Sequence, residues 1–249
     1  MMMTLFKPAI AIMNYLKYPQ KFFLISLLFI LPLALVTNLL LLEINSRIEF
    51  TQKEIYGNAY LRPLNQLWQN IPRRQLILQR QFYKITQSFG QILHSQSQEL
   101  ADLQRKIDQA LIKLTNVDHQ LGKTVQTNDK LQDLKFAWLG LRDSQEFASF
   151  RNYDVLIEQL DYFRIHIVDF FNLILDPEID TYYLMDASAV KLPEMQKLLY
   201  QVMQIEAEVI FKQEISNTNR EQLITCIGLL NSYNDAIAAN LERAFKNNP

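Results

Sequence analysis

Two short segments bring together aromatic and charged side chains that could bind a solute. The first covers residues 56–64, where Tyr56 and Tyr60 would share one face of a helix. Arg62 lies beside Pro63, and its planar guanidinium is suited to bidentate capture of a carboxylate. The alternative is that both tyrosines are core aromatics and that Arg62 is solvated or pairs with a nearby acid.

The second segment covers residues 175–186, where Asp186 follows Tyr182 by four residues and Tyr183 by three. On a helix these three side chains share one surface, so a carboxylate and two phenols could line a small pocket between helices. Asp186 could instead pair internally, for example with Arg62. The predicted ligand site, for a small anionic solute, comprises Tyr60, Arg62, Tyr182, Tyr183 and Asp186.

Other chemistry is poorly represented in the sequence. His166 and Asp169 lie three residues apart, which is half of a metal site at most, and a His–Asp hydrogen bond is the simpler account. The single cysteine, Cys226, excludes an internal disulfide and fits a small buried hydrophobe. With five glycines and no nucleophile or phosphate-loop motif, we expect neither an enzyme nor a cofactor, and no metal. The net charge of −1 gives no indication of nucleic-acid binding.

An uncharged run of about 21 residues, 22–42, determines where the chain is expected to reside. As a helix it would cover roughly 30 Å, the thickness of the hydrocarbon core of a bilayer. A buried core helix is seldom apolar on every face, and a signal peptide has a shorter apolar region and a cleavage site. We therefore predict a transmembrane helix in the inner (plasma) membrane.

Charges on either side of the run predict the orientation. Lys7, Lys17 and Lys21 precede it without any acid, whereas both signs follow it. The positive-inside rule then places the N-terminus in the cytoplasm and the rest in the periplasm. The expected organisation is a cytoplasmic segment 1–21, a membrane span 22–42 and an extracytoplasmic domain 43–249.

The extracytoplasmic part is predicted to be all-α, an elongated antiparallel bundle of long helices. Apolar stripes at helical spacing occupy residues 89–121, 150–174, 192–209 and 223–245, and the first keeps a heptad spacing. Prolines and polar turns divide the chain into expected helices at 43–71, 73–121, 129–175, 178–213 and 219–246. Pro63 and Pro72 are expected to break or kink the first of these, and Pro193 the fourth near Lys191. Asn128 or Asp129 is the expected cap of the third helix, and Asp176 is the expected cap of the fourth, with Pro177 at its first position.

Three stretches resemble a known group of membrane proteins. They are Lys17–Lys21 before the leucine-rich span, EINSRIEFTQKEIYGNAYLRPL after it, and LDPEIDTYYLMDASAVKLPE. They resemble the N-terminal region of bacterial transmembrane receptors, which include methyl-accepting chemotaxis proteins, histidine kinases and diguanylate cyclases. The resemblance implies a helical periplasmic sensor between two membrane spans, usually in a homodimer. The second span and the output domain of such receptors are absent from this sequence.

The odd number of helices leaves one without a partner in an up-down bundle. This favours a truncated gene product or fragment, or a decayed receptor, over a stand-alone sensor that works through a partner.

Two functions are therefore considered. The first is an extracytoplasmic signal-input module of a membrane receptor for chemotaxis or two-component-type signalling, without an output domain of its own. The second is a single-span membrane-anchored helical spacer that oligomerises, for instance through the 89–121 seam, and binds no solute. A solute that stabilises the protein would favour the first.

Overall fold

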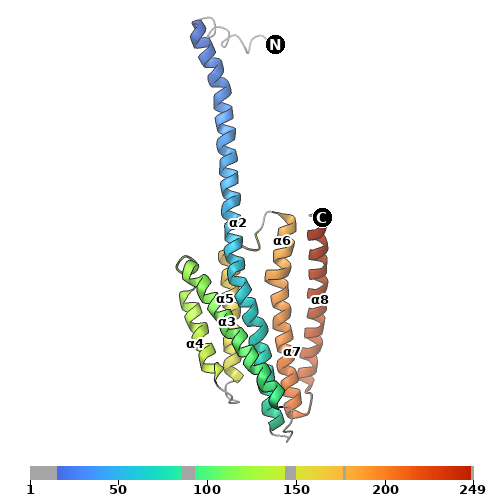
Figure 1. Cartoon of the computed structure of the whole chain (residues 1–249). Coiled ribbons are helices and arrows are strands. Elements are labelled where there is room, and N and C mark those ends of the chain that lie inside the picture. Colours follow the sequence, from blue (N-terminus) through green and yellow to red (C-terminus); the bar gives the residue numbers. More distant parts are fainter. Residues whose placement is uncertain (1–15, 86–92, 144–149, 176–177, 248–249) are drawn as a thin grey trace. The chain divides into compact units, whose positions relative to one another are not determined.

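The computed structural model describes residues 16–85, 93–143, 150–175 and 178–247. Within these ranges every regular element is a helix and there is no strand, which confirms the all-α prediction (Figure 1). The elements are α2 (Tyr18–Ile85), α3 (Leu93–Val125), α4 (Asn128–Arg142), α5 (Phe150–Phe170), α6 (Ile179–Met185), the π-helix η3 (Asp186–Lys191), α7 (Leu192–Lys212) and α8 (Asn217–Asn247).

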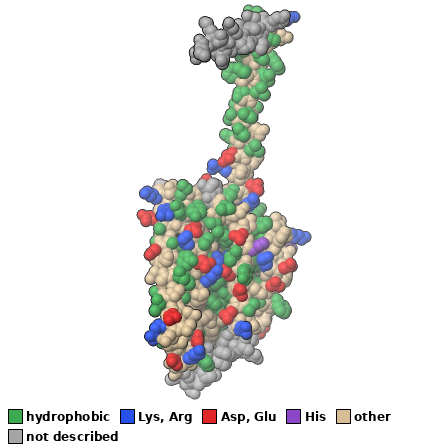
Figure 2. Space-filling model, turned by 180° about the vertical axis from the view of Figure 1, so that it is seen from behind, with side chains coloured by type: hydrophobic (Ala, Val, Ile, Leu, Met, Phe, Trp, Pro, Cys, Tyr) green, Lys and Arg blue, Asp and Glu red, His purple; other side chains and the backbone are tan. Residues whose placement is uncertain are grey.

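The chain divides into two compact units, Met1–Gln52 and Lys53–Pro249. The first part of α2 belongs to the first unit, and there its apolar side chains are exposed (Figure 2). In the described part of the chain, α2 is the one helix that is long and apolar enough to cross a membrane. An exposed apolar surface on all sides of a helix is what a membrane span requires.

Helix α2 runs for 68 residues without interruption, so the expected end of one helix at residue 71 and start of another at 73 is wrong, while a kink at Pro63 or Pro72 stays a prediction. A proline inside a helix costs about 3 kcal/mol because it removes a hydrogen bond and crowds the preceding turn. Both prolines are buried, and between them Leu64, Leu67 and Ile71 are almost completely buried. Packing of these side chains offsets the local cost, which a count of prolines in the sequence does not include.

The core of the second unit lies where α2, α3, α4 and α5 meet. Its largest fully buried side chains come from all four helices and include Tyr60, Leu114, Trp138, Tyr153 and Phe163. The heptad seam of α3 packs into this core from Leu100 to Leu121. Phe89 and the side chains of Leu93 and Gln96 lie outside the described residues.

A polar turn joins α3 to α4 against α2. Tyr60 Oη donates a hydrogen bond to Asp118 Oδ1 at 3.1 Å and lies 3.2 Å from Thr127 Oγ1. Gly122 leaves room for the Asp118 carboxylate, since a Cβ at residue 122 would lie 2.6 Å from Asp118 Oδ2. Helix α4 starts at Asn128 with Thr127 at the cap position, so the expected cap at Asn128 or Asp129 is wrong by one or two residues.

The expected single helix 129–175 is two helices, because α4 ends at Arg142 and α5 begins at Phe150. Arg74 of α2 marks the break. It is 4% exposed, its Nη2 donates to the Arg142 carbonyl at 2.6 Å, and its guanidinium lies 5.2 Å from the Trp138 ring. A buried arginine thus satisfies the end of α4, and this distant partner cannot be identified from the local sequence.

The second half of the unit consists of α6, η3 and α7, which follow one another end to end, and of α8, which lies beside all three (Figure 1). Asp176 and Pro177, the expected start of a helix, lie outside the described residues, and α6 begins at Ile179. The expected irregularity before Pro193 is present as the π-helix η3, in which the Leu192 N–H bonds to the Ala187 carbonyl.

The two C-terminal apolar stripes are buried less than expected. Leu192 and Leu199 on α7, and Ile227 on α8, are 45%, 49% and 55% exposed.

Candidate functional site

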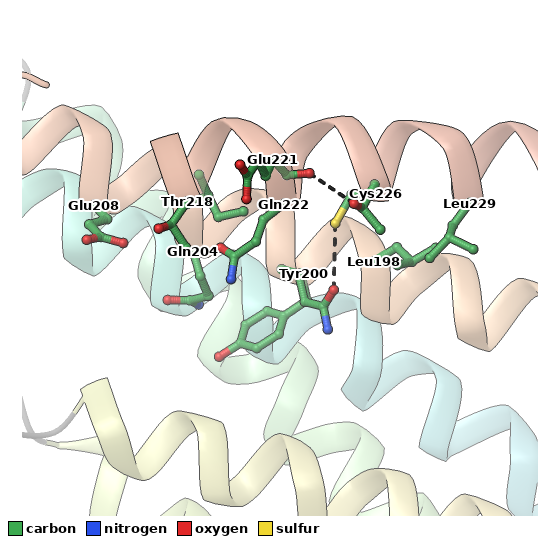
Figure 3. A pocket seen from close by; sticks show the side chains of 12 residues that line it. Leu198, Tyr200, Gln204, Glu208, Thr218, Glu221, Gln222, Cys226 and Leu229 are labelled. Carbon is green, nitrogen blue, oxygen red and sulfur yellow. Dashed lines mark hydrogen bonds between the residues drawn. The ribbon is translucent and has the colours of Figure 1, made fainter. Parts of the chain in front are cut away.

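A half-open pocket of about 630 Å³ lies between α7 and α8 (Figure 3). Its size falls in the range of small-molecule sites. Helix α7 contributes Leu198, Tyr200, Gln201, Gln204, Ile205 and Glu208, and α8 contributes Thr218, Glu221, Gln222, Thr225, Cys226 and Leu229.

The lining is rich in hydrogen-bonding groups and contains no lysine or arginine. Glu208 and Glu221 supply carboxylates, and three glutamines supply amides that can both donate and accept. Leucine and isoleucine side chains form the apolar part of the wall. This combination can hold a neutral or cationic polar solute in a fixed orientation.

The turn between α7 and α8 fixes the end of the pocket. Gln213 has a left-handed φ of 54°, and Ser216 Oγ accepts a hydrogen bond from the Asn219 N–H at 3.0 Å, as a helix cap does. Glu208 Oε1 accepts a hydrogen bond from Lys212 Nζ at 2.5 Å. This bond lowers the pKa of Glu208, so its carboxylate is ionised at neutral pH.

The α7 wall of the pocket is bound to α2. Tyr200 Oη donates to Gln75 Oε1 at 2.9 Å and also contacts the carboxylate of Asp154. Burial, and then the hydrogen bond and charge of Asp154, raise the pKa of Tyr200 above its ordinary value. Gln204 Oε1 accepts from Gln79 Nε2 at 3.2 Å. Any displacement of α7 at the pocket therefore acts directly on α2.

Cys226 lies in the wall of the pocket, and its Sγ is 3.7 Å from Gln201 Oε1 (Figure 3). It is 5% exposed, as expected for a small buried hydrophobe. Its side chain leaves room for the pocket without adding charge.

The structure places the sequence-predicted Tyr60 in the core rather than in this pocket. Its phenol is fully buried and bonded to Asp118 and Thr127. Arg62 lies on the exposed side of α2. Tyr60 is therefore a core aromatic, which was the alternative to a ligand-binding role.

The other predicted residues lie at the junction of α6, η3 and α8. Asp186 accepts a hydrogen bond from Asn240 Nδ2 at 2.7 Å and forms an ion pair with Lys191. Tyr182 and Tyr183 contact each other edge-on, and Arg243 lies over the Tyr183 ring. Among the described residues, no contact connects this group with Tyr60 or Arg62, and a single site built from all five stays a prediction.

His166 forms a different contact from the expected bond to Asp169. Its Nε2 lies 2.7 Å from the Val125 carbonyl, so this nitrogen carries the proton. In the described part of the chain, no group of three or more His, Cys, Asp or Glu side chains could hold a metal ion.

Sequence reasoning did not identify the α7–α8 pocket, although a pattern for it exists. Gln201, Gln204 and Glu208 are spaced by three and four residues, and so are Thr218, Glu221 and Thr225. Two polar stripes on either side of a turn would face each other in a helical hairpin.

Comparison with protein-family models, with curated proteins and with solved structures finds no match to this chain.

Proposed function

We propose that this protein is the extracytoplasmic signal-input module of a membrane receptor for chemotaxis or two-component-type signalling. In this proposal residues 22–42 cross the inner membrane with the N-terminus in the cytoplasm. The helices that follow form an antiparallel bundle in the periplasm, which binds a small solute. An output domain would be supplied by further chain or by a partner.

One observation carries the proposal: helix α2 contains both the candidate membrane span and much of the core of the second unit. A helix keeps its backbone hydrogen bonds when it shifts or rotates as a body, so it can carry a displacement along its axis. The core residues Tyr60, Leu64 and Trp68 are on the same helix as the apolar run. Repacking of these core residues would act on the same helix that carries the apolar run.

The pocket has a direct connection to α2. Besides the Gln79–Gln204 and Gln75–Tyr200 hydrogen bonds, Arg80 and Glu206 form an ion pair at 2.6 Å. A solute that binds between α7 and α8 would favour one position of α7 over another. Coupling of this kind commonly amounts to about 1–3 kcal/mol, and it requires different affinities for the two arrangements.

The chemistry of the pocket favours a neutral or cationic solute. Glu208 is paired with Lys212, but Glu221 would repel an anion, and no lysine or arginine lines the pocket. The anionic solute expected from Arg62 would have to bind elsewhere, on the exposed side of α2.

The alternative is the membrane-anchored helical spacer. It was based on pairing between chains through the 89–121 seam, but Leu103, Ile107 and Leu114 of this seam are buried inside the unit. Exposed apolar residues on α8 leave another surface for oligomer formation, so an oligomer alone does not distinguish the spacer from the sensor. The spacer hypothesis requires that no solute binds.

The test is a thermal-stability screen of the full chain in lipid nanodiscs with amines, polyols, amino acids and carboxylic acids. A solute at 100 times its Kd should stabilise the fold by about 2.7 kcal/mol. Glu221→Gln should weaken a cationic solute about tenfold, the equivalent of roughly 1.4 kcal/mol. Glu242→Gln, an exposed acid of α8 outside the pocket, is the matched control and should change nothing.

Other outcomes identify the alternatives. Stabilisation by carboxylic acids that is lost in Arg62→Ala would move the site to the face predicted from the sequence. A chain that responds to no solute class would support the spacer.

A further inference from the structure

Hydrogen bonds within the protein orient two glutamine amides in the wall of the α7–α8 pocket. Gln204 Oε1 accepts a hydrogen bond from Gln79 Nε2 of α2 at 3.2 Å. Gln201 Oε1 accepts one from the Cys226 thiol at 3.7 Å. A side-chain amide carries its oxygen and its NH2 group on opposite sides, so an amide whose oxygen is bonded within the protein has N–H groups left to offer. Both glutamines line the pocket, and α7 therefore presents N–H donors to it.

Gln79 determines which way the Gln204 amide faces. The Gln79 side chain is 5% exposed, and its Oε1 has no hydrogen-bond partner in the described part of the chain. If both amides turned over, that oxygen would gain a partner, but the two N–H groups of Gln79 would be buried without an acceptor. Unpaired buried N–H groups are rarer than unpaired carbonyl oxygens, so the observed orientation is favoured. Gln79 is thus a positioning residue for Gln204, although it does not line the pocket.

The register of α7 and α8 brings an acceptor close to these donors. Two contacts set this antiparallel register: Gln201 with Cys226, and Glu208 with Asn219. It places Gln204 beside the turn of α8 that contains Glu221, and Figure 3 shows both side chains at the same end of the pocket. Glu208 is already paired with Lys212, so among the residues that line the pocket Glu221 is the carboxylate available to a cation.

We infer that the pocket binds a small amine that also carries a hydroxyl or a neutral carbonyl oxygen. Its ammonium group would pair with Glu221, and its oxygen would accept a hydrogen bond from Gln204 Nε2. A simple alkylamine would leave the Gln204 N–H unpaired, and a diol would bring no cation to Glu221. The carboxylate of an amino acid would meet the negative charge of Glu221. The inference rests on the proposed function, because it names the ligand class of the same pocket.

The oxygen of such a ligand would complete a chain of hydrogen bonds from α2 to the pocket. Gln79 Nε2 donates to Gln204 Oε1, and Gln204 Nε2 would donate to the ligand. Both bonds run in the same direction, and hydrogen bonds arranged in this way polarise and strengthen one another. A ligand without an acceptor oxygen would act on α2 less directly.

A titration of thermal stability, with the full chain in lipid nanodiscs, tests the ligand class. The probes are ω-amino alcohols of two to four carbon atoms, compared with alkylamines and diols of the same chain lengths. Because bound solute stabilises the fold in proportion to its affinity, each titration gives a Kd. We expect the best amino alcohol to bind about fivefold more tightly than the matched alkylamine, which is the effect of one hydrogen bond.

Variants of the residues that carry the inference should change this preference. Glu221→Gln should weaken every amine about tenfold and leave the diols unchanged. Gln79→Leu together with Gln204→Leu replaces both amides by apolar groups, so neither partner is left unsatisfied. This double variant should still bind alkylamines but should lose the preference for amino alcohols. Gln79→Leu alone should reduce that preference, because the Gln204 amide is then free to turn.

Gln120→Leu, at an exposed glutamine of α3, is the matched control and should change no affinity. Circular dichroism of each variant checks that the fold is kept.

Several results would overturn the inference. They are equal affinities for amino alcohols and alkylamines in the wild type, a preference that survives in the double variant, diol binding as tight as amino-alcohol binding, and the absence of binding by any probe. In each case the proposed function stands if another solute class stabilises the chain in the thermal screen. A chain that responds to no solute class, or that is absent from the membrane fraction, would contradict the proposed function itself.

Discussion

At the scale of single residues, two buried phenols connect helices that are far apart in the sequence. Tyr60 joins α2 to the α3–α4 turn, and Tyr200 joins α7 to α2 and α5. Burial, together with the nearby Asp118 and Asp154, raises the pKa of both groups above the ordinary value of about 10. Both side chains are therefore neutral hydrogen-bond donors throughout the physiological range.

The stability of the fold should fall in alkali because of these phenols. An acid whose pKa is raised in the folded state retains a proton that the unfolded chain releases above pH ~10. Their contribution is complete below pH ~10 and is lost as the pH rises toward the folded pKa. Tyr60→Phe should lower the free energy of unfolding by about 1–3 kcal/mol at pH 8. The difference in this free energy between the variant and the wild type should become smaller between pH 10 and about 11.5.

Urea denaturation of the full chain in detergent at several pH values measures this difference. Tyr162→Phe, at a residue that is 63% exposed, is the control and should differ little from the wild type at any pH. A Tyr60→Phe difference that stays constant from pH 8 to 11.5 would contradict the assignment of the buried phenol.

The sequence identified Tyr60 and Asp186 as chemically notable but could not assign their partners. Asp118 lies 58 residues from Tyr60, and Asn240 lies 54 residues from Asp186. The same chemistry that makes a tyrosine or a carboxylate useful in a site makes it useful as an internal bond. Only the fold distinguishes these two uses.

At the scale of elements, the π-helix η3 and Pro193 form one structural unit with Arg164. Pro193 has no N–H, so the Ala189 carbonyl, four residues before it, loses its helical partner. Arg164 Nη1 donates to this carbonyl at 2.9 Å, and the Arg164 side chain is 3% exposed. Arg164 Nη2 also contacts Asp161, which pairs with Lys197 of α7.

A double-mutant cycle should show that the contribution of Arg164 to stability depends on Pro193. Arg164→Met leaves the Ala189 carbonyl unsatisfied and should cost about 2–3 kcal/mol. In a Pro193→Ala background the new N–H can bond to that carbonyl, so the cost of Arg164→Met should fall by about 1 kcal/mol. Urea denaturation of the four chains measures the coupling.

Arg105→Met, at an exposed arginine of α3, is the control for the cycle and should show no coupling to position 193. If the effects of Arg164→Met and Pro193→Ala add without a coupling term, the carbonyl contact does not hold η3 in place.

The sequence predicted the character of the elements better than their ends. Long amphipathic helices and the irregularity near Lys191 followed from spacing and from Pro193. Pro63 and Pro72 do not end α2, because packing on either side compensates for them. The division at Arg142 depends on Arg74, which is distant in sequence and gives no local pattern.

At the scale of the whole molecule, an exposed apolar helix and a helical unit with its own core share α2. The apolar run was evident in the sequence because a membrane span depends on composition alone. The α7–α8 pocket was not, because it depends on which polar faces two helices turn toward each other.

Membrane topology tests most directly the proposal that α2 crosses the membrane with the second unit outside the cytoplasm. We would label single cysteines in intact cells with a membrane-impermeant maleimide, using Ser232→Cys and Lys17→Cys in the Cys226→Ala background. We expect labelling of residue 232 in intact cells, and of residue 17 only after the cells are permeabilised. Labelling of residue 17 but not of residue 232 in intact cells, or recovery of the chain in the soluble fraction, would contradict it.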